Sequence, residues 1–166
     1  MTRLEGVFET LRIRAGQPWQ AHRHEARMRQ GAEHMGVPFP QSAWAKALQK
    51  VGDMMLRIDL DADGSLRTTS RAFTPHPEAP ISVITSGSKL EMHPWRGAKP
   101  AQMPVHQAAK EEAGRAGADD ALLACGDRVA EATTANVFAW IEGRCYAPGP
   151  QSGAVGGIAR QVLLPD

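Results

Sequence analysis

The chain has 166 residues, enough for one domain or two small ones, and its 42% of hydrophobic residues allow a packed core. Its 19 basic and 18 acidic residues nearly cancel, so no basic field predicts binding to nucleic acid or to an anionic membrane surface. No apolar run is long enough to span a bilayer, and residues 1–6 lack the apolar stretch that a signal peptide would have. Two cysteines without metal-ligand spacing lead us to expect a reducing cytoplasm.

The first half of the chain predicts a small unit of strands and helices. The β-rich alternation of residues 7–13 predicts a strand. Helix formers with apolar residues at helical spacing predict a helix over residues 21–36, with Gly36 as its stop. A shorter helix is expected over residues 42–51, with Ser42 as its N-cap. Two strands joined by a hairpin turn follow at residues 54–60 and 65–73. A proline-rich loop at residues 74–80 then leads to a further strand at residues 81–85.

The second half predicts a helix over a β-meander. The helix covers residues 103–116, and short turns separate the strands that follow it. These strands are expected at residues 121–124, 128–131, 136–141 and 144–146. A glycine-rich loop at residues 152–157 then leads into a helix over residues 158–164. A break near residues 94–99 is the candidate boundary, which gives an N-terminal domain of residues 1–94 and a second domain of residues 95–166.

Lys99 and Glu131 are the residue pair that first suggests chemistry. Lys99 follows a Gly97-Ala98 break and precedes the predicted helix, and Glu131 comes thirty-two residues later. A lysine amine can form a Schiff base with a carbonyl cofactor. A carboxylate beside the ring nitrogen of pyridoxal phosphate (PLP) can keep that ring protonated, so that it acts as an electron sink. Neither residue is diagnostic by itself.

The glycine-rich loop before Ile158 and Ala159 is a candidate phosphate site. Glycines let the backbone approach a ligand closely, and a helix start offers unpaired N–H groups to a phosphate. The alternative is an ordinary loop and helix cap.

Two arginines are candidates for binding anions. Arg27 lies on the first predicted helix among other basic residues, so a solvated helix face is its alternative reading. Arg57 stands in the middle of an apolar strand and needs an anionic partner, either a substrate carboxylate or a structural ion pair. The six histidines are scattered, so no metal site is expected, and the absence of a Gly-x-Ser-x-Gly elbow argues against a serine hydrolase.

Six segments, taken in order, resemble the class IV (fold type IV) PLP-dependent aminotransferases, which include branched-chain aminotransferase, D-amino acid aminotransferase and 4-amino-4-deoxychorismate lyase. The segments are residues 6–13, 24–28, 99–113, 117–123, 131–138 and 157–160. No single motif is specific for this family, but the order and spacing of the six motifs together are. The resemblance implies an α+β fold with a small N-terminal α/β domain and an abbreviated C-terminal β-meander or barrel-like domain with helices.

The resemblance also implies a role for each candidate residue. Lys99 is the catalytic Schiff-base lysine, Arg27 holds the cofactor phosphate, and Glu131 meets the pyridine nitrogen. Three further candidates in the second half contact the cofactor: Thr134, Ile158 and Ala159. Two candidates in the first half, Phe8 and Arg57, contact the substrate. Position 159 is alanine where the family usually has threonine.

The activity implied is PLP-dependent transfer of an amino group between an amino acid and a 2-oxo acid. Elimination of the 4-amino-4-deoxychorismate lyase type with the same cofactor is an alternative, and a non-catalytic or truncated relative with weak or no PLP binding is another. We expect a short, C-terminally abbreviated member that forms a homodimer near Lys99, because its apolar strands, residues 121–124 and 137–141, lack the elements that cover them in the family.

Overall fold

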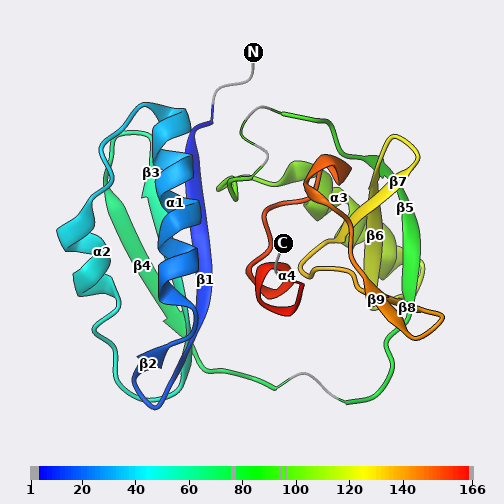
Figure 1. Ribbon diagram of the computed structural model, residues 1–166, viewed down its shortest axis with the longest axis horizontal. Helices are drawn as coiled ribbons and strands as arrows, with labels where there is room; N and C mark the ends of the chain where they lie inside the picture. Colours follow the sequence, from blue (N-terminus) through cyan, green and yellow to red (C-terminus); the bar gives the residue numbers. More distant parts are fainter. Residues whose placement is uncertain (1–3, 76–77, 94, 96, 165–166) are drawn as a thin grey trace. The chain divides into compact units, whose positions relative to one another are not determined.

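The computed structural model describes residues 4–75, 78–93, 95 and 97–164, which fold into two compact units (Figure 1). The first unit is Met1–Pro77 with Gly97–Gln102, and the second is Glu78–Arg96 with Met103–Asp166. The mixed class of helices and strands expected from the sequence is confirmed. The division into two continuous domains at residues 94 and 95 stays a prediction, and Pro94 and Arg96 lie outside the described residues.

The first unit is built on an antiparallel sheet with strand order β2-β1-β3-β4. Its strands are β1 (Gly6–Arg14), β2 (Gln17–Pro18), β3 (Met54–Asp61) and β4 (Leu66–Arg71). Alternate residues of β1 are buried, as the period of a half-buried strand requires. The predicted hairpin at residues 61–64 is confirmed, and it joins β3 to β4.

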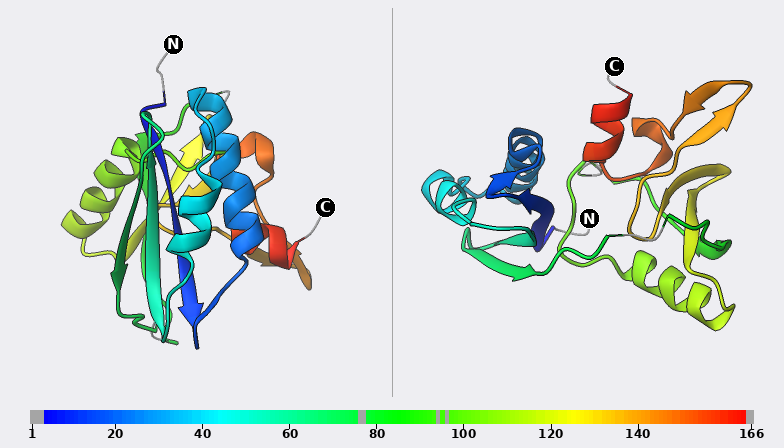
Figure 2. Two further views of the ribbon diagram at one scale, coloured as in Figure 1. Left: turned by 90° about the vertical axis from the view of Figure 1, so that its left-hand side faces the viewer. Right: turned by 90° about the horizontal axis from the view of Figure 1, so that it is seen from below.

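Two helices, α1 (Ala21–Met35) and α2 (Gln41–Ala47), lie on the same face of this sheet (Figure 2). Gly36 ends α1 in the left-handed conformation at φ 72°, as predicted. The predicted N-cap Ser42 is wrong, because α2 begins one residue earlier and follows Pro40. This helix ends at Ala47 rather than at residue 51, because the backbone tightens into shorter-range hydrogen bonds as it approaches a turn at Gly52.

The second unit contains a three-stranded sheet of β5 (Val83–Lys89), β6 (Asp120–Cys125) and β7 (Arg128–Ala132). Strand β5 runs parallel to β6, and helix α3 (Pro104–Arg115) connects them. Strands β8 (Ala139–Ile141) and β9 (Arg144–Tyr146) form a separate hairpin. A short 3₁₀ helix η1 (Pro150–Ser152) and helix α4 (Ile158–Leu163) complete the unit.

The meander predicted for the second half is present as two separate antiparallel pairs, β6–β7 and β8–β9. The sheet takes its first strand from before α3, and the residues after β7 leave the ladder. There the Ala132 N–H bonds the Ala135 carbonyl in a turn, while the Thr133 and Thr134 hydroxyls donate to Asp120. The two hydroxyls thus bond to the first residue of β6, and the β8–β9 hairpin forms a sheet of its own.

Helix α3 covers the strand that the sequence suggested was exposed. Ala121 and Leu123 of β6 are fully buried in a core that also contains Ala109 and Ala113 of α3. The expectation that residues 121–124 lack a cover is thus wrong. Among the large apolar residues of this unit, Trp140 on the β8–β9 hairpin is highly exposed, at 76%.

Candidate active site

Lys99 is held against the first strand by backbone pairing. The Phe8 N–H donates to the Lys99 carbonyl at 2.9 Å, the Ala101 N–H donates to the Gly6 carbonyl at 2.9 Å, and Val7 and Pro100 form an antiparallel bridge. Residues directly opposite in such a pairing project their side chains to the same face. Lys99 Nζ accordingly lies 4.5 Å from the centroid of the Phe8 ring.

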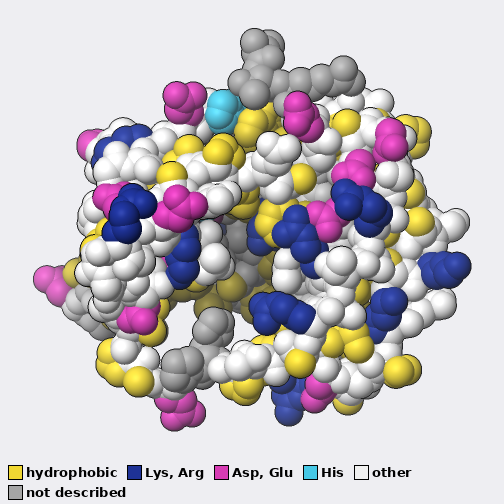
Figure 3. All heavy atoms as spheres, turned by 180° about the vertical axis from the view of Figure 1, so that it is seen from behind, with side chains coloured by type: hydrophobic (Ala, Val, Ile, Leu, Met, Phe, Trp, Pro, Cys, Tyr) yellow, Lys and Arg dark blue, Asp and Glu magenta, His cyan; other side chains and the backbone are white. Residues whose placement is uncertain are grey.

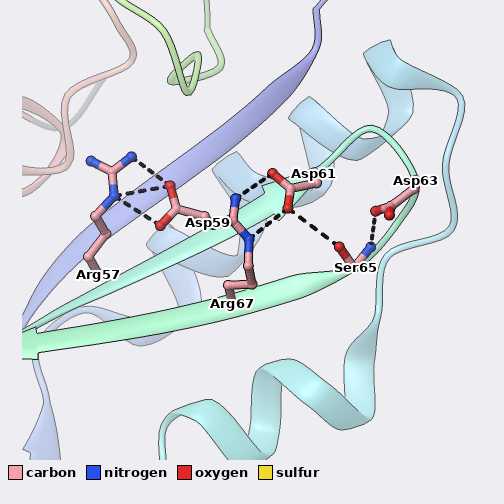
Figure 4. Close-up of polar contacts among 6 residues, drawn as sticks. All are labelled: Arg57, Asp59, Asp61, Asp63, Ser65 and Arg67. Atoms are coloured by element: carbon pink, nitrogen blue, oxygen red, sulfur yellow. Dashed lines mark hydrogen bonds and ion pairs between the residues drawn. The ribbon is translucent and has the colours of Figure 1, made fainter.

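Arg57 reaches the same aromatic ring from β3. Its guanidinium carbon lies 3.7 Å from the Phe8 ring centroid, within cation–π distance. The Arg57 Nη2 also donates to Asp59 Oδ1 at 2.6 Å, beside a second pair between Arg67 and Asp61 (Figure 4). The sequence left two possible partners for Arg57, a substrate carboxylate or a structural ion pair. The structure contains the ion pair, with Asp59. The structure therefore brings two predicted site residues, Arg57 and Lys99, to the ring of a third, Phe8.

Arg27 belongs to a buried ion cluster on the other face of β1. Its Nε and Nη2 donate to the two carboxylate oxygens of Glu9 at 2.7 and 2.6 Å, and His24 Nδ1 lies 2.6 Å from Glu9 Oε2. Burial raises the pKa of Glu9, but the hydrogen bonds from Arg27 and His24 outweigh it and hold that pKa below 4.5. The solvated-face reading of Arg27 is wrong.

Sequence reasoning gave no role to Glu9 and His24. The sequence did contain a signal for a buried Glu9. In the alternating pattern of β1, Glu9 lies on the same face as Val7 and Leu11, which are both buried in the core. A carboxylate at a core position needs a buried cationic or hydrogen-bonding partner. His24 and Arg27, three residues apart on α1, provide it.

Glu131 is buried in the second unit, where its carboxylate contacts a helix and a loop. His106 Nε2, from α3, lies 2.9 Å from Glu131 Oε1, and the Val155 N–H donates to Oε2 at 3.1 Å. His106 was missed, because nothing in its local sequence links it to a residue twenty-five positions later. The carboxylate thereby connects a helix, strand β7 and the loop that precedes α4.

The remaining candidates lie near this loop. Ile158 and Ala159 begin α4 directly after Gly157. The Asn136 side chain lies so close to the Gly157 backbone that a Cβ there would clash with its amide group. Thr134 donates to Asp120 Oδ2 at 3.4 Å. Burial raises the pKa of Asp120, but hydrogen bonds from the Thr133 hydroxyl and the Ala121 N–H lower it below its ordinary range.

The candidate residues divide between the two units. Lys99, Phe8, Arg57 and Arg27 belong to the first unit, and the second holds Glu131, Thr134, Ile158 and Ala159. On the face drawn in Figure 3, basic and acidic side chains lie interspersed. Over the part of the chain that the structure describes, no helix is long and apolar enough to cross a membrane, and no group of three or more metal-binding side chains occurs.

Comparison with known proteins identifies the family. The model of amino-transferase class IV matches residues 6–165, and the chain belongs to this family. It is similar to a "Probable branched-chain-amino-acid aminotransferase" of Rickettsia typhi, with 29% identity over 95% of this chain. The chain spans 63% of the length of that curated relative.

Solved structures share the fold. A Legionella pneumophila protein assigned as a 4-amino-4-deoxychorismate lyase is 24% identical, with a TM-score of 0.87 over 96% of this chain and 68% of its own. A hypothetical aminotransferase from Mycobacterium tuberculosis in a PLP-bound form is 22% identical, with a TM-score of 0.78 over 97% of this chain and 67% of its own. These likenesses confirm the fold class expected from the sequence.

Proposed function

We propose that the protein uses PLP to transfer an amino group between an amino acid and a 2-oxo acid. Lys99 carries this proposal. It is a half-buried primary amine whose own backbone is hydrogen-bonded to β1, beside an aromatic ring and a guanidinium. Membership in the class IV aminotransferase family supports the assignment.

The chemistry of the donor set fits PLP. Lys99 offers an amine to an aldehyde, Arg27 offers a guanidinium whose plane is fixed by Glu9, and Glu131 offers a buried carboxylate. A guanidinium suits the phosphate of such a cofactor, and a carboxylate suits a protonated ring nitrogen. A relative with the same fold is described in a PLP-bound form.

Each residue then has a definite task. When bound, PLP supplies an electron sink for negative charge that develops at the substrate α-carbon. Lys99 would supply the amine that holds the cofactor aldehyde, and its free amine would move the substrate α-proton as general base and acid. Glu131 would hold the cofactor by accepting a hydrogen bond from its protonated ring nitrogen. The phosphate contact that we propose in the first unit is Arg27, and those that we propose in the second are the backbone N–H groups of Ile158 and Ala159.

The contacts at the substrate end follow from the first unit. Phe8 provides an apolar wall for the bound substrate, and Arg57 provides positive charge for a carboxylate while remaining paired to Asp59. Thr134 is a further cofactor contact. Its hydroxyl is oriented by the bond to Asp120.

A lyase of the 4-amino-4-deoxychorismate type is the second candidate. It would use the same lysine and cofactor but eliminate pyruvate and leave 4-aminobenzoate. The structural likeness to a 4-amino-4-deoxychorismate lyase from Pseudomonas aeruginosa, with a TM-score of 0.78 and 24% identity, favours keeping it in the test.

We also propose a homodimer in the cytoplasm. The β8–β9 hairpin exposes Trp140, Ile141 and Tyr146, and apolar side chains gathered on one hairpin gain stability when a partner covers them. The two cysteines are free thiols, which suits a reducing compartment. Light scattering over a dilution series tests the dimer, and an active monomer would contradict it.

The experiment for the activity has two stages. The purified protein is first titrated with PLP, and we expect a visible absorption band that sodium borohydride bleaches. It is then given a panel of L- and D-amino acids with 2-oxoglutarate and pyruvate, and separately 4-amino-4-deoxychorismate. Amino transfer supports the proposal, pyruvate release without an acceptor supports the lyase, and no band overturns both in favour of a non-catalytic relative.

A further inference from the structure

We infer that His106 is a positioning residue, which fixes the Glu131 carboxylate in the orientation needed to meet the cofactor ring nitrogen. The inference rests on the role proposed for Glu131. It concerns a histidine that the proposed reaction does not otherwise use, and all the contacts that support it lie within the second unit.

The geometry holds the carboxylate at both oxygens. His106 Nε2 lies 2.9 Å from Oε1, and the Val155 N–H donates to Oε2 at 3.1 Å. The side chains of His106 and Glu131 are only 8% and 7% exposed, so bulk water does not compete for these bonds. A rotation of the carboxylate about its terminal bond breaks one contact or both, and its plane is therefore set by α3 and by the loop before α4.

The hydrogen-bonding roles follow from the chemical nature of the acceptor. An ionised carboxylate only accepts hydrogen bonds, so Nε2 of His106 carries the proton in this contact. A residue that positions another side chain does so best when its own rotamer is fixed by packing. His106 is buried in the first turn of α3, and this packing restricts its rotamer.

The same carboxylate links two parts of the proposed cofactor site. Val155 lies in the loop that leads directly to Ile158 and Ala159, the proposed phosphate contacts. Loss of the His106 contact would release Oε1 from α3 and leave the Val155 contact at Oε2 in place. We therefore expect a change at His106 to alter the environment of the ring nitrogen more than the grip on the phosphate.

The test compares His106→Leu, His106→Gln and the exposed neighbour Gln107→Leu as a matched control on α3. A glutamine amide can donate a hydrogen bond from about the place of Nε2, whereas leucine cannot. We expect His106→Leu to lower kcat about tenfold, as the loss of one hydrogen bond to a charged group implies. We expect its KM for the amino donor to stay within about twofold, since the substrate contacts are unchanged.

The visible spectrum of the PLP-loaded protein separates positioning from simple stabilisation. We expect the pH dependence of the absorption band to move in His106→Leu and to return toward wild type in His106→Gln, while Gln107→Leu matches wild type. Equal spectra and equal kcat in all four proteins would overturn the inference while leaving the proposed function intact. A wild-type protein that forms no band with PLP would overturn the proposed function and the inference together.

Discussion

Lys99 lies directly opposite Phe8, across a backbone pairing that joins the middle of the chain to its first strand. The Phe8 N–H donates to the Lys99 carbonyl at 2.9 Å, and the lysine Nζ lies 4.5 Å from the Phe8 ring. The register of this pairing decides the direction in which each side chain points. The position of the Lys99 amine therefore depends on residues 6–8 as well as on the residues around Lys99.

The first prediction concerns which lysine reacts. We expect borohydride reduction of the PLP-loaded protein, followed by digestion and mass spectrometry, to find the pyridoxyl group on Lys99. Lys99→Met should lose the visible band, and Lys89→Met should keep it, because Lys89 is exposed on β5. A label on any other lysine contradicts the assignment.

The second prediction concerns Arg27 and its partner. Arg27→Ala should weaken PLP binding and also destabilise the fold by about 3–5 kcal/mol, because it leaves the buried Glu9 charge without its bidentate partner. Arg29→Ala, on the exposed face of the same helix, should leave PLP binding unchanged and destabilise the fold by less, because its contacts with Glu25 and Phe39 are exposed to solvent. Cofactor titration and urea unfolding measure the two effects separately.

A double variant resolves the two roles of Arg27. Glu9→Gln combined with Arg27→Ala removes the uncompensated charge and should recover part of the stability, but not the affinity for PLP. If the double variant also recovers cofactor binding, the guanidinium acts only by holding the fold.

The sequence predicted the elements whose patterns are local. Strand β1 alternates, and α1 has helical spacing and a glycine stop at Gly36, so both were found nearly to the residue. The parallel pairing of β5 with β6 was not predicted, because no local pattern links strands separated by α3. The contact of His106 with Glu131 escaped for the same reason, since it depends on how α3 packs.

The candidate residues of the site were selected by motif order rather than by geometry. That order could not show that Arg27 is buried against Glu9, because the helix around it is rich in charge. Nor could it show that Arg57 pairs with Asp59 two residues later on the same strand. Both ion pairs depend on the face that each side chain takes in the folded sheet and helix.

The third prediction uses two helical glycines that differ only in their surroundings. A Cβ at Gly31 would lie 2.6 Å from Cγ1 of Val7, so Gly31→Ala should destabilise the protein by about 1–3 kcal/mol through overpacking. A Cβ at Gly114 meets nothing within 4 Å, so Gly114→Ala should be stabilising by about 0.5 kcal/mol. Urea unfolding followed by circular dichroism measures both, and equal effects would contradict the close packing of α1 on β1.

The fourth prediction is a loss of stability in acid. The pKa of Glu9 is lower in the folded protein than its ordinary value of 4.5, so the ionised carboxylate stabilises the fold fully above pH 4.5. This contribution is lost as the pH falls through the folded pKa. We expect the free energy of unfolding of wild type to exceed that of Glu9→Gln at pH 7, with a difference that shrinks below pH 4.5.

An exposed carboxylate on α1 supplies the control for the acid series. Glu33→Gln should match wild type throughout the pH range, because Glu33 lies on the solvent side of the helix. A difference between wild type and Glu9→Gln that does not change with pH would show that the Glu9 contacts do not depend on its charge.

The last prediction is that Glu131→Gln binds PLP but turns over about a hundredfold more slowly, a loss of about 3 kcal/mol in transition-state stabilisation. The amide has one accepting oxygen and one donating nitrogen, so it cannot accept from both His106 and Val155 as the carboxylate does. It also carries no charge to favour a protonated ring. Glu111→Gln, an exposed change on α3, should behave as wild type. Single-turnover kinetics with saturating amino donor measure the chemical step, and a wild-type rate in Glu131→Gln would reduce this carboxylate to a structural link between α3 and the loop before α4.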